Sequence, residues 1–333
     1  MTDLSVSYMG LKLKSPIVVG SSNLTNSLSN IKKIEAAGAG AVVLKSIFEE
    51  EIYHEYEDIL KKDTAQFGET DEYLDYFDFK IKEDNIKKYI SLIEEAKKAV
   101  NIPIIGSINC TSNHEWTYFA KKIQEAGADA LELNVFIMPL NFNKSSEEIE
   151  KIYFDIANKI KQELSIPVAL KISYYFSNLA DTVTKLSNTG IDGIVLFNRF
   201  FSPDFDIDNF KVVPTNVLSN DSDLHLPLTF ISLLSSRVNC DLIASTGVHD
   251  GASVIKQLLA GAQATQVVSV LYKKGIGYVA TMLDEVKSWM EKHNFNSIED
   301  FRGKMSQAAS DNPAIYERVQ FMKYFGEKEY DLD

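Results

Sequence analysis

The apolar residues of this chain gather in short runs that do not alternate with polar residues. Examples are IVVGSS after Pro16, AVVLKS from Ala41, ALELNVF from Ala130 and GIVLFN from Gly193. Near-continuous Val, Ile, Leu and Ala is typical of parallel strands that are covered on both faces. We therefore predict eight strands, at about residues 16–21, 41–46, 103–109, 130–136, 167–173, 193–198, 242–246 and 264–270.

Amphipathic stretches with helical periodicity separate these runs. NIKKYISLIEEAKKAV and SEEIEKIYFDIANKIKQEL are two examples, and several stretches end in a Gly-Ala turn. A glycine after a helix ends it, and parallel strands need a helical crossover between them. The alternation predicts one α/β domain over residues 1–333, a TIM (β/α)8 barrel. A doubly wound open sheet is the main alternative, but the first strand is followed by Gly20-Ser21-Ser22-Asn23, which is not a dinucleotide fingerprint.

Two insertions break the regular spacing. Residues 48–82 follow the second predicted strand, and residues 199–228 follow the sixth. Both would lie at the C-terminal face of a barrel, where active sites are built. We interpret them as lids or substrate loops, although a dimer contact or a surface hairpin explains each of them about as well. A helical extension is expected over about 297–333.

The charge balance bears on the class of partner that this protein binds. The chain has 34 Lys and Arg against 47 Asp and Glu, a formal net charge of −13. This argues against a nucleic-acid partner, because affinity for a duplex depends on cations that neutralise phosphates. The two cysteines form no disulfide framework, and neither a signal peptide nor a membrane-spanning apolar run is visible. We expect a cytoplasmic protein that binds neither membrane nor nucleic acid.

Polar side chains stand where five of the predicted strands end. They are two cations and three amides: Lys45, Asn109, Asn134, Lys171 and Asn198. A lone lysine there is most often a surface residue with a buried stem, and a lone asparagine is often a turn former. Five of them at one face of a barrel indicate a site for a negatively charged ligand with many hydrogen-bond acceptors.

The ends of the last two predicted strands indicate a phosphate site. The seventh strand ends in Ser245, Thr246 and Gly247, and the eighth ends in Ser269. Barrels often bind phosphate through these two loops, where glycines let backbone N–H groups approach the anion. The five histidines show no metal-ligand spacing, so we predict no metal site.

The succession KSPIVVGSS, LKS, ELN, ALKIS, LFN and STGV resembles the dihydroorotate dehydrogenase family. The resemblance covers about residues 4–305. It is greatest for the soluble class 1 branch, in the subgroup of dihydroorotate dehydrogenase-like proteins. It implies a barrel that binds FMN, oxidises a small substrate by hydride transfer to flavin N5, and forms a homodimer.

The resemblance also implies which residues contact the flavin. Seven residues are expected at the flavin: Gly20, Ser21, Ser22, Lys45, Ser46, Asn109 and Asn134. Asn109 stands at the end of the third strand. Lys171 would lie beside the N1/O2 edge, where a positive charge stabilises reduced flavin. We therefore regard Lys45, Lys171 and Asn134 as the catalytic residues.

Phosphate and substrate are assigned in the same way. Thr246, Gly247 and Ser269 match the phosphate loops of the family. The expected substrate ligands are the amides of Asn134, Asn141 and Asn198.

The sequence departs from the family at the catalytic base. The family places Cys or Ser in an Asn-Leu-Ser-Cys-Pro-Asn phrase after the fourth strand, whereas this chain has Ile137, which cannot accept a proton. Cys110, Tyr174 and Tyr175 are the alternative bases that the sequence offers. A buried, inert role is the more common one for a cysteine such as Cys110. The family's substrate segment after the second strand is also not visible, since GETDEYLDYF stands there.

Four functions remain open on this basis. The first is an FMN-dependent oxidoreductase that acts on a dihydropyrimidine-like substrate without the usual base. The second is an authentic dihydroorotate dehydrogenase of pyrimidine biosynthesis with a replacement base. The third is a flavin- or phosphate-binding barrel with little turnover. The fourth is a flavin-free lyase or isomerase in which Lys171 forms a Schiff base.

Overall fold

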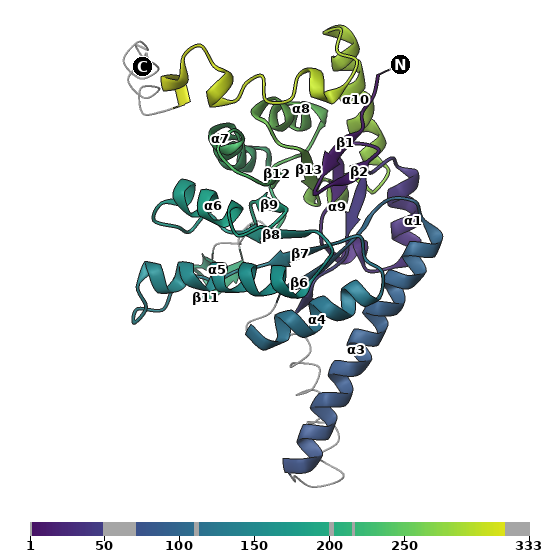
Figure 1. Ribbon diagram of the computed structural model, residues 1–333, viewed down its shortest axis with the longest axis vertical. Coiled ribbons are helices and arrows are strands. Elements are labelled where there is room, and N and C mark those ends of the chain that lie inside the picture. Colours follow the sequence, from purple (N-terminus) through teal and green to yellow (C-terminus); the bar gives the residue numbers. More distant parts are fainter. Residues whose placement is uncertain (1, 49–70, 110–112, 200–202, 215–216, 317–333) are drawn as a thin grey trace.

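The structure, a computed structural model, describes residues 2–48, 71–109, 113–199, 203–214 and 217–316, and only the backbone of residues 71–84 and 113–115 (Figure 1). Within these ranges, eight parallel strands close into a barrel, with β13 paired to β3 and β4 paired to β6. The barrel strands are β3 (Ile17–Val19), β4 (Ala41–Val43), β6 (Ile104–Asn109), β7 (Ala130–Asn134), β8 (Val168–Ile172), β9 (Gly193–Leu196), β12 (Asp241–Ser245) and β13 (Ala264–Val267). All eight fall in the predicted positions, so the TIM barrel is confirmed.

Helices connect successive strands and cover the outside of the barrel (Figure 1). They are α1 (Leu28–Ala36), α3 (Asp71–Ala99), α4 (Asn113–Glu125), α5 (Ser146–Glu163), α6 (Leu179–Ser187), α7 (His225–Leu234), α8 (Gly251–Ala260), α9 (Ser269–Lys274) and α10 (Tyr278–Lys292). Strands β3, β4, β8, β9 and β13 are buried at every residue. Side chains are therefore covered both inside the ring and under the helices, which explains the continuous apolar runs in the sequence.

An N-terminal hairpin closes one end of the barrel. It consists of β1 (Val6–Tyr8) and β2 (Leu11–Leu13). The backbone N–H of Met9 donates to a carboxylate oxygen of Asp241 at 2.6 Å, and Tyr8 packs so closely on Gly193 that a Cβ there would meet its ring at 3.1 Å. Asp241 and Gly193 begin strands β12 and β9, so the hairpin covers the N-terminal end of the barrel. A ligand must enter at the opposite, C-terminal end.

The insertion after β4 is partly helical. It begins with β5 (Ile47–Phe48), which pairs with the end of β6. The helix expected from about residue 85 begins at Asp71, so residues 71–82 of the predicted lid form the first turns of α3. Figure 1 shows these turns extending beyond the barrel.

The insertion after β9 forms a hairpin and a short 3₁₀ helix. The hairpin pairs β10 (Pro203–Asp206) with β11 (Lys211–Pro214), and η2 (Asp221–Leu224) leads into α7. The hairpin is largely exposed, whereas η2 lies on the barrel, where the backbone of Leu224 leaves no room for a Cβ at Gly247. Within this insertion, the hairpin is therefore exposed, whereas η2 packs on the barrel.

The C-terminal extension is helical only in single turns over the described residues. These are η3 (Ile298–Asp300), η4 (Gln307–Ala309) and η5 (Pro313–Tyr316), and no α-helix forms between residues 297 and 316. The backbone N–H groups of Gly303 and Met305 donate to carbonyls of α8 at 2.9 and 2.8 Å. Because these donors bond to another element, the continuous helix suggested by SIEDFRGKMSQAA does not form. No helix of the described residues is apolar over a bilayer-spanning length.

Candidate functional site

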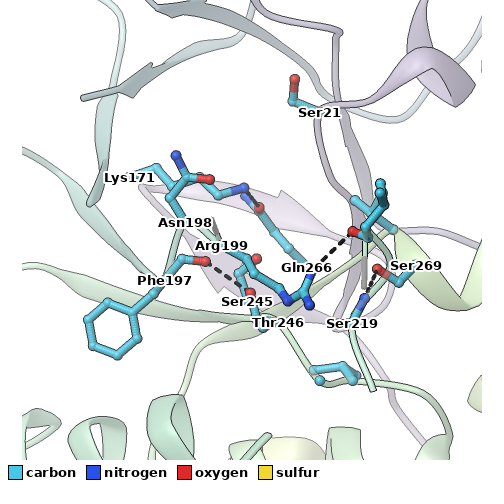
Figure 2. A pocket seen from close by; sticks show the side chains of 14 residues that line it. Ser21, Lys171, Phe197, Asn198, Arg199, Ser219, Ser245, Thr246, Gln266 and Ser269 are labelled. Carbon is cyan, nitrogen blue, oxygen red and sulfur yellow. Dashed lines mark hydrogen bonds between the residues drawn. The ribbon is translucent and has the colours of Figure 1, made fainter. Parts of the chain in front are cut away.

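A polar cavity of about 160 Å³ opens at the C-terminal ends of the barrel strands (Figure 2). Its lining is Ser21, Lys171, Phe197, Asn198, Arg199, Val217, Ser219, Ser245, Thr246, Gly247, Val248, Gln266, Val268 and Ser269. The set contains two cations, two amides and five hydroxyls, and none of these described lining residues is a carboxylate. Such a surface attracts a ligand that is anionic and rich in hydrogen-bond acceptors.

Lys171 reaches this cavity from β8 and is itself 8% exposed. Its ammonium donates to the side-chain oxygen of Gln266 on β13 at 2.9 Å. The amide nitrogen of Gln266 in turn donates to the carboxylate of Glu132 on β7 at 2.5 Å, and the second oxygen of Glu132 lies 3.7 Å from Lys171 Nζ. Lys171 is thus held by a buried amide and a buried carboxylate from two other strands.

Two amides meet across β8, the strand that carries Lys171. Asn198, just after β9, donates through Nδ2 to the side-chain oxygen of Asn134 at the end of β7, at 2.8 Å. Because β8 lies between these two strands, the amide pair spans the strand that carries Lys171. The bond uses one donor of Asn198 and leaves its oxygen as an acceptor at the cavity.

A row of hydroxyls crosses the first three barrel strands. Ser46 lies 3.0 Å from Ser21 and 2.7 Å from Ser107, oxygen to oxygen, and its backbone N–H donates to Ser21 at 2.8 Å. The strand ends β3, β4 and β6 are therefore tied together beside the cavity. Gly20 has no room for a side chain here, because a Cβ would lie 2.9 Å from Val268.

The loop after β12 forms the other end of the cavity. Thr246 and Gly247 both have positive φ, +84° and +76°. A β-branched residue in this region is strained, and such strain collects at ligand sites. Gly247 also lies directly under η2, which leaves no space for a Cβ.

Ser219, from the insertion after β9, joins this loop to the end of β13. Its backbone N–H donates to Ser269 Oγ at 2.9 Å, and its carbonyl accepts from Lys273 Nζ at 2.6 Å. Its hydroxyl lies 2.9 Å from Nε2 of His249. Burial lowers the pKa of His249, and the nearby Lys273 ammonium lowers it further. The insertion is thereby fixed to both loops that were expected to hold phosphate.

The same insertion supplies a second cation. Arg199 Nε donates to Asp223 at 3.2 Å, and Nη1 donates to the carbonyl of Val217 at 2.9 Å. Figure 2 shows the Arg199 side chain between Lys171 on one side and Ser269 on the other. The guanidinium therefore lies across the cavity, close to the strained Thr246 loop.

Comparison with known proteins assigns the chain to a family. The sequence model of dihydroorotate dehydrogenases matches residues 69–290, more than half of the chain. The chain belongs to the dihydroorotate dehydrogenase family. It is similar to the catalytic subunit of dihydroorotate dehydrogenase B (NAD(+)) from Thermoplasma volcanium, with 27% identity over 91% of this chain and 98% of the relative.

Dihydropyrimidine dehydrogenases are also among its relatives. The chloroplastic dihydropyrimidine dehydrogenase (NADP(+)) of Arabidopsis thaliana is 24% identical over 92% of this chain and 77% of the relative. A subunit of the NAD-dependent dihydropyrimidine dehydrogenase of Escherichia coli K12 is 22% identical over 90% of this chain and 76% of the relative. These relatives are dehydrogenases, so this member of the dihydroorotate dehydrogenase family is an oxidoreductase.

The structure groups most of the residues expected from the family around the cavity. The expected residues that line it are Ser21, Lys171, Asn198, Thr246, Gly247 and Ser269. Gly20, Ser46 and Asn134 do not line it but adjoin lining residues, namely Val268, Ser21 and Asn198. Ser22 is not among the lining residues and caps the 3₁₀ helix η1 (Asn23–Thr25), where its hydroxyl accepts from the backbone of Leu24 at 3.3 Å.

Other expected residues lie outside the cavity lining. Lys45 is half-buried, with its ammonium 5.8 Å from the centre of the Phe48 ring. Asn109 is opposite Phe48 in the β5–β6 pairing. Asn141 is exposed and lines a separate cavity of about 450 Å³ beside Tyr174, so the structure places it away from the Lys171 cavity.

This chain has no base at the position where the family has its catalytic Cys or Ser. Ile137 is half-buried, and its backbone N–H donates to the Tyr153 hydroxyl at 3.3 Å. Cys110, the first alternative, lies outside the described residues. Hydrogen bonding to Tyr174 and burial raise the pKa of Tyr175 to about 12, which leaves little phenolate at neutral pH and disfavours it as a base. Among the described residues, no cluster of three or more His, Cys, Asp or Glu is arranged to hold a metal.

Sequence reasoning missed four residues of this site: Glu132, Gln266, Arg199 and Ser219. Glu132 and Gln266 had a visible signal, because a charged residue and an amide interrupt the apolar runs ALELN and ATQVV. A polar residue inside a buried strand needs a buried partner. Arg199 and Ser219 had no such signal, since only the path of the insertion brings them to the cavity.

Proposed function

We propose that this protein is an FMN-dependent oxidoreductase that removes hydride from a small, dihydropyrimidine-like substrate. The observation that carries the proposal is the cavity lining, in which Lys171 and Arg199 face the same space and none of the described lining residues is a carboxylate. A flavin mononucleotide has the matching chemistry, with a phosphate at one end and ring carbonyls at the other.

The donor set fits this cofactor at both ends. Arg199, Ser219 and Ser269 would receive the phosphate beside the Thr246 loop, and Lys171 would face the acceptor edge of the ring. The cavity, at about 160 Å³, is smaller than the roughly 300–1,000 Å³ of most small-molecule sites. Since Arg199 lies across it, we expect this side chain to move when FMN binds.

Each side chain would have a distinct task. Bound FMN would supply the hydride acceptor. Lys171 would hold a positive charge at the edge of the ring, where electron density increases on reduction. The Asn134–Asn198 pair would orient the substrate through its ring amides. Ile137 could not take the proton that leaves the neighbouring carbon of the substrate, so this proton would pass to solvent at the open C-terminal end of the barrel.

Two alternative functions would use the same site. The similarity to dihydroorotate dehydrogenase B favours authentic dihydroorotate oxidation with a replacement base, whereas the missing base favours a barrel that binds flavin with little turnover. We further propose a cytoplasmic homodimer, which light scattering of the purified protein would test.

An anaerobic absorbance titration separates these functions. Purified protein is loaded with FMN, freed of unbound flavin and titrated with dihydrouracil and, separately, with dihydroorotate. We expect a flavin band that is bleached by the dihydropyrimidine. Bleaching by dihydroorotate alone would identify a dihydroorotate dehydrogenase, and an unbleached band would support the binding protein. Failure to retain FMN would refute the proposal.

A further inference from the structure

Glu132 is a buried acid that the proposed reaction does not itself use. It is 1% exposed, lies inside β7 and does not line the cavity. One carboxylate oxygen accepts from Gln266, while the other has no hydrogen-bond partner among the described residues. A carboxylate buried in this way is costly unless it has a charged partner. Its ion-pair partner is Lys171, at 3.7 Å.

Glu132 also fixes the orientation of Gln266. The amide nitrogen of Gln266 must face the carboxylate, because an amide oxygen there would be repelled. The amide oxygen is then directed to Lys171, which donates to it at 2.9 Å. Lys171 and Gln266 line the cavity, whereas Glu132 does not. Side chains of three strands therefore form one chain of polar contacts from the barrel interior to the ligand surface.

We propose that Glu132 is a positioning residue that holds Lys171 through Gln266 and, by its negative charge, limits how strongly the site favours reduced over oxidised flavin. The inference rests on the proposed binding of FMN. Lys171 alone would stabilise the anionic reduced ring. A carboxylate behind it offsets part of that charge, because charges act over several Å in a poorly solvated interior.

The expected measurement is a shift in the flavin midpoint potential. We expect Glu132→Gln to raise the ratio of affinities for reduced and oxidised FMN about tenfold, which for a two-electron couple is a shift of about 30 mV. Glu132→Asp keeps the charge and should remain near the unmodified protein. Glu125→Gln removes an exposed carboxylate of α4 and should leave the potential unchanged, because solvent and salt screen it.

A second measurement needs no flavin. In the apoprotein, a double-mutant cycle of Glu132→Gln and Lys171→Met on urea unfolding should give a favourable coupling between the two side chains. A potential that moves equally in Glu132→Gln and Glu125→Gln, or does not move, would overturn the inference even with the coupling present. Absence of coupling would overturn it as well. A protein that retains no FMN refutes the proposed function, and the inference with it.

Discussion

Asn198 donates a 2.8 Å hydrogen bond to Asn134 across the strand that carries Lys171. The two amides therefore form one unit across β8, although 64 residues separate them in the chain. This arrangement places donors and acceptors where a substrate could meet a flavin held by Lys171.

Removing one amide should weaken substrate binding more than cofactor binding. We expect Asn198→Ala to raise the substrate concentration for half-maximal flavin bleaching about 5- to 150-fold, the equivalent of the roughly 1–3 kcal/mol for an unsatisfied partner. The matched control is Asn239→Ala, which breaks an exposed amide pair with Asn188 of 2.7 Å. Equal effects of the two substitutions would contradict the substrate role.

Arg199 should contribute to FMN retention. Arg199→Ala removes a guanidinium from the cavity, and charged hydrogen bonds are worth roughly 1.5–3 kcal/mol, so we expect FMN to bind at least about tenfold more weakly. Fluorescence quenching of added FMN measures this affinity. Arg237→Ala, at the exposed end of α7, is the control. An unchanged FMN affinity for Arg199→Ala would remove Arg199 from the phosphate site.

Lys45 lies outside the cavity lining, yet the family resemblance assigns it a flavin contact. We expect Lys45→Ala to weaken FMN retention or slow flavin reduction, whereas Lys33→Ala on the exposed face of α1 should do neither. Stopped-flow absorbance and equilibrium quenching check the two effects. Wild-type behaviour in both would show that Lys45 has lost the role it has in the family.

A thiol at position 137 should not restore dihydroorotate oxidation by itself. Asn141, the next expected substrate ligand, is exposed at a separate cavity, so Ile137→Cys would add a base without the surrounding contacts. We expect no increase in the rate of flavin bleaching by dihydroorotate. A clear gain in that rate would show that the base alone is missing and would favour the dihydroorotate dehydrogenase alternative.

The buried His249 should make stability depend on pH. Its pKa is lowered from the ordinary value of 6.5, so below about pH 6.5 the unfolded chain takes up a proton before the folded one does. Stability is then retained above this pH and lost as the pH falls towards the lowered pKa of the folded state. Between pH 7.5 and 5, we expect the free energy of unfolding in urea to fall less for His249→Gln than for the unmodified protein. The exposed His293→Gln should lose as much stability as the unmodified protein. Parallel losses in all three proteins would contradict this assignment.

The pattern of the chain determined the barrel. Strands buried on both faces must be continuously apolar, and parallel strands must be separated by helices, so both features can be read locally. The same logic located Lys171, Asn134, Asn198 and Ser269, because strand ends in a barrel converge on one face. The missing base at Ile137 was visible only through the resemblance to the family, which has Cys or Ser at this position after the fourth strand.

Only the tertiary structure decided which of these residues meet. The relay from Glu132 through Gln266 to Lys171 joins β7, β13 and β8, and its partners depend on barrel closure rather than on local sequence. Arg199 reaches the cavity because η2 packs on Gly247 and places Asp223 where it can pair with the guanidinium. The local sequence pattern determines which face of a strand a residue occupies. The distances between side chains of different strands depend on how the whole barrel packs.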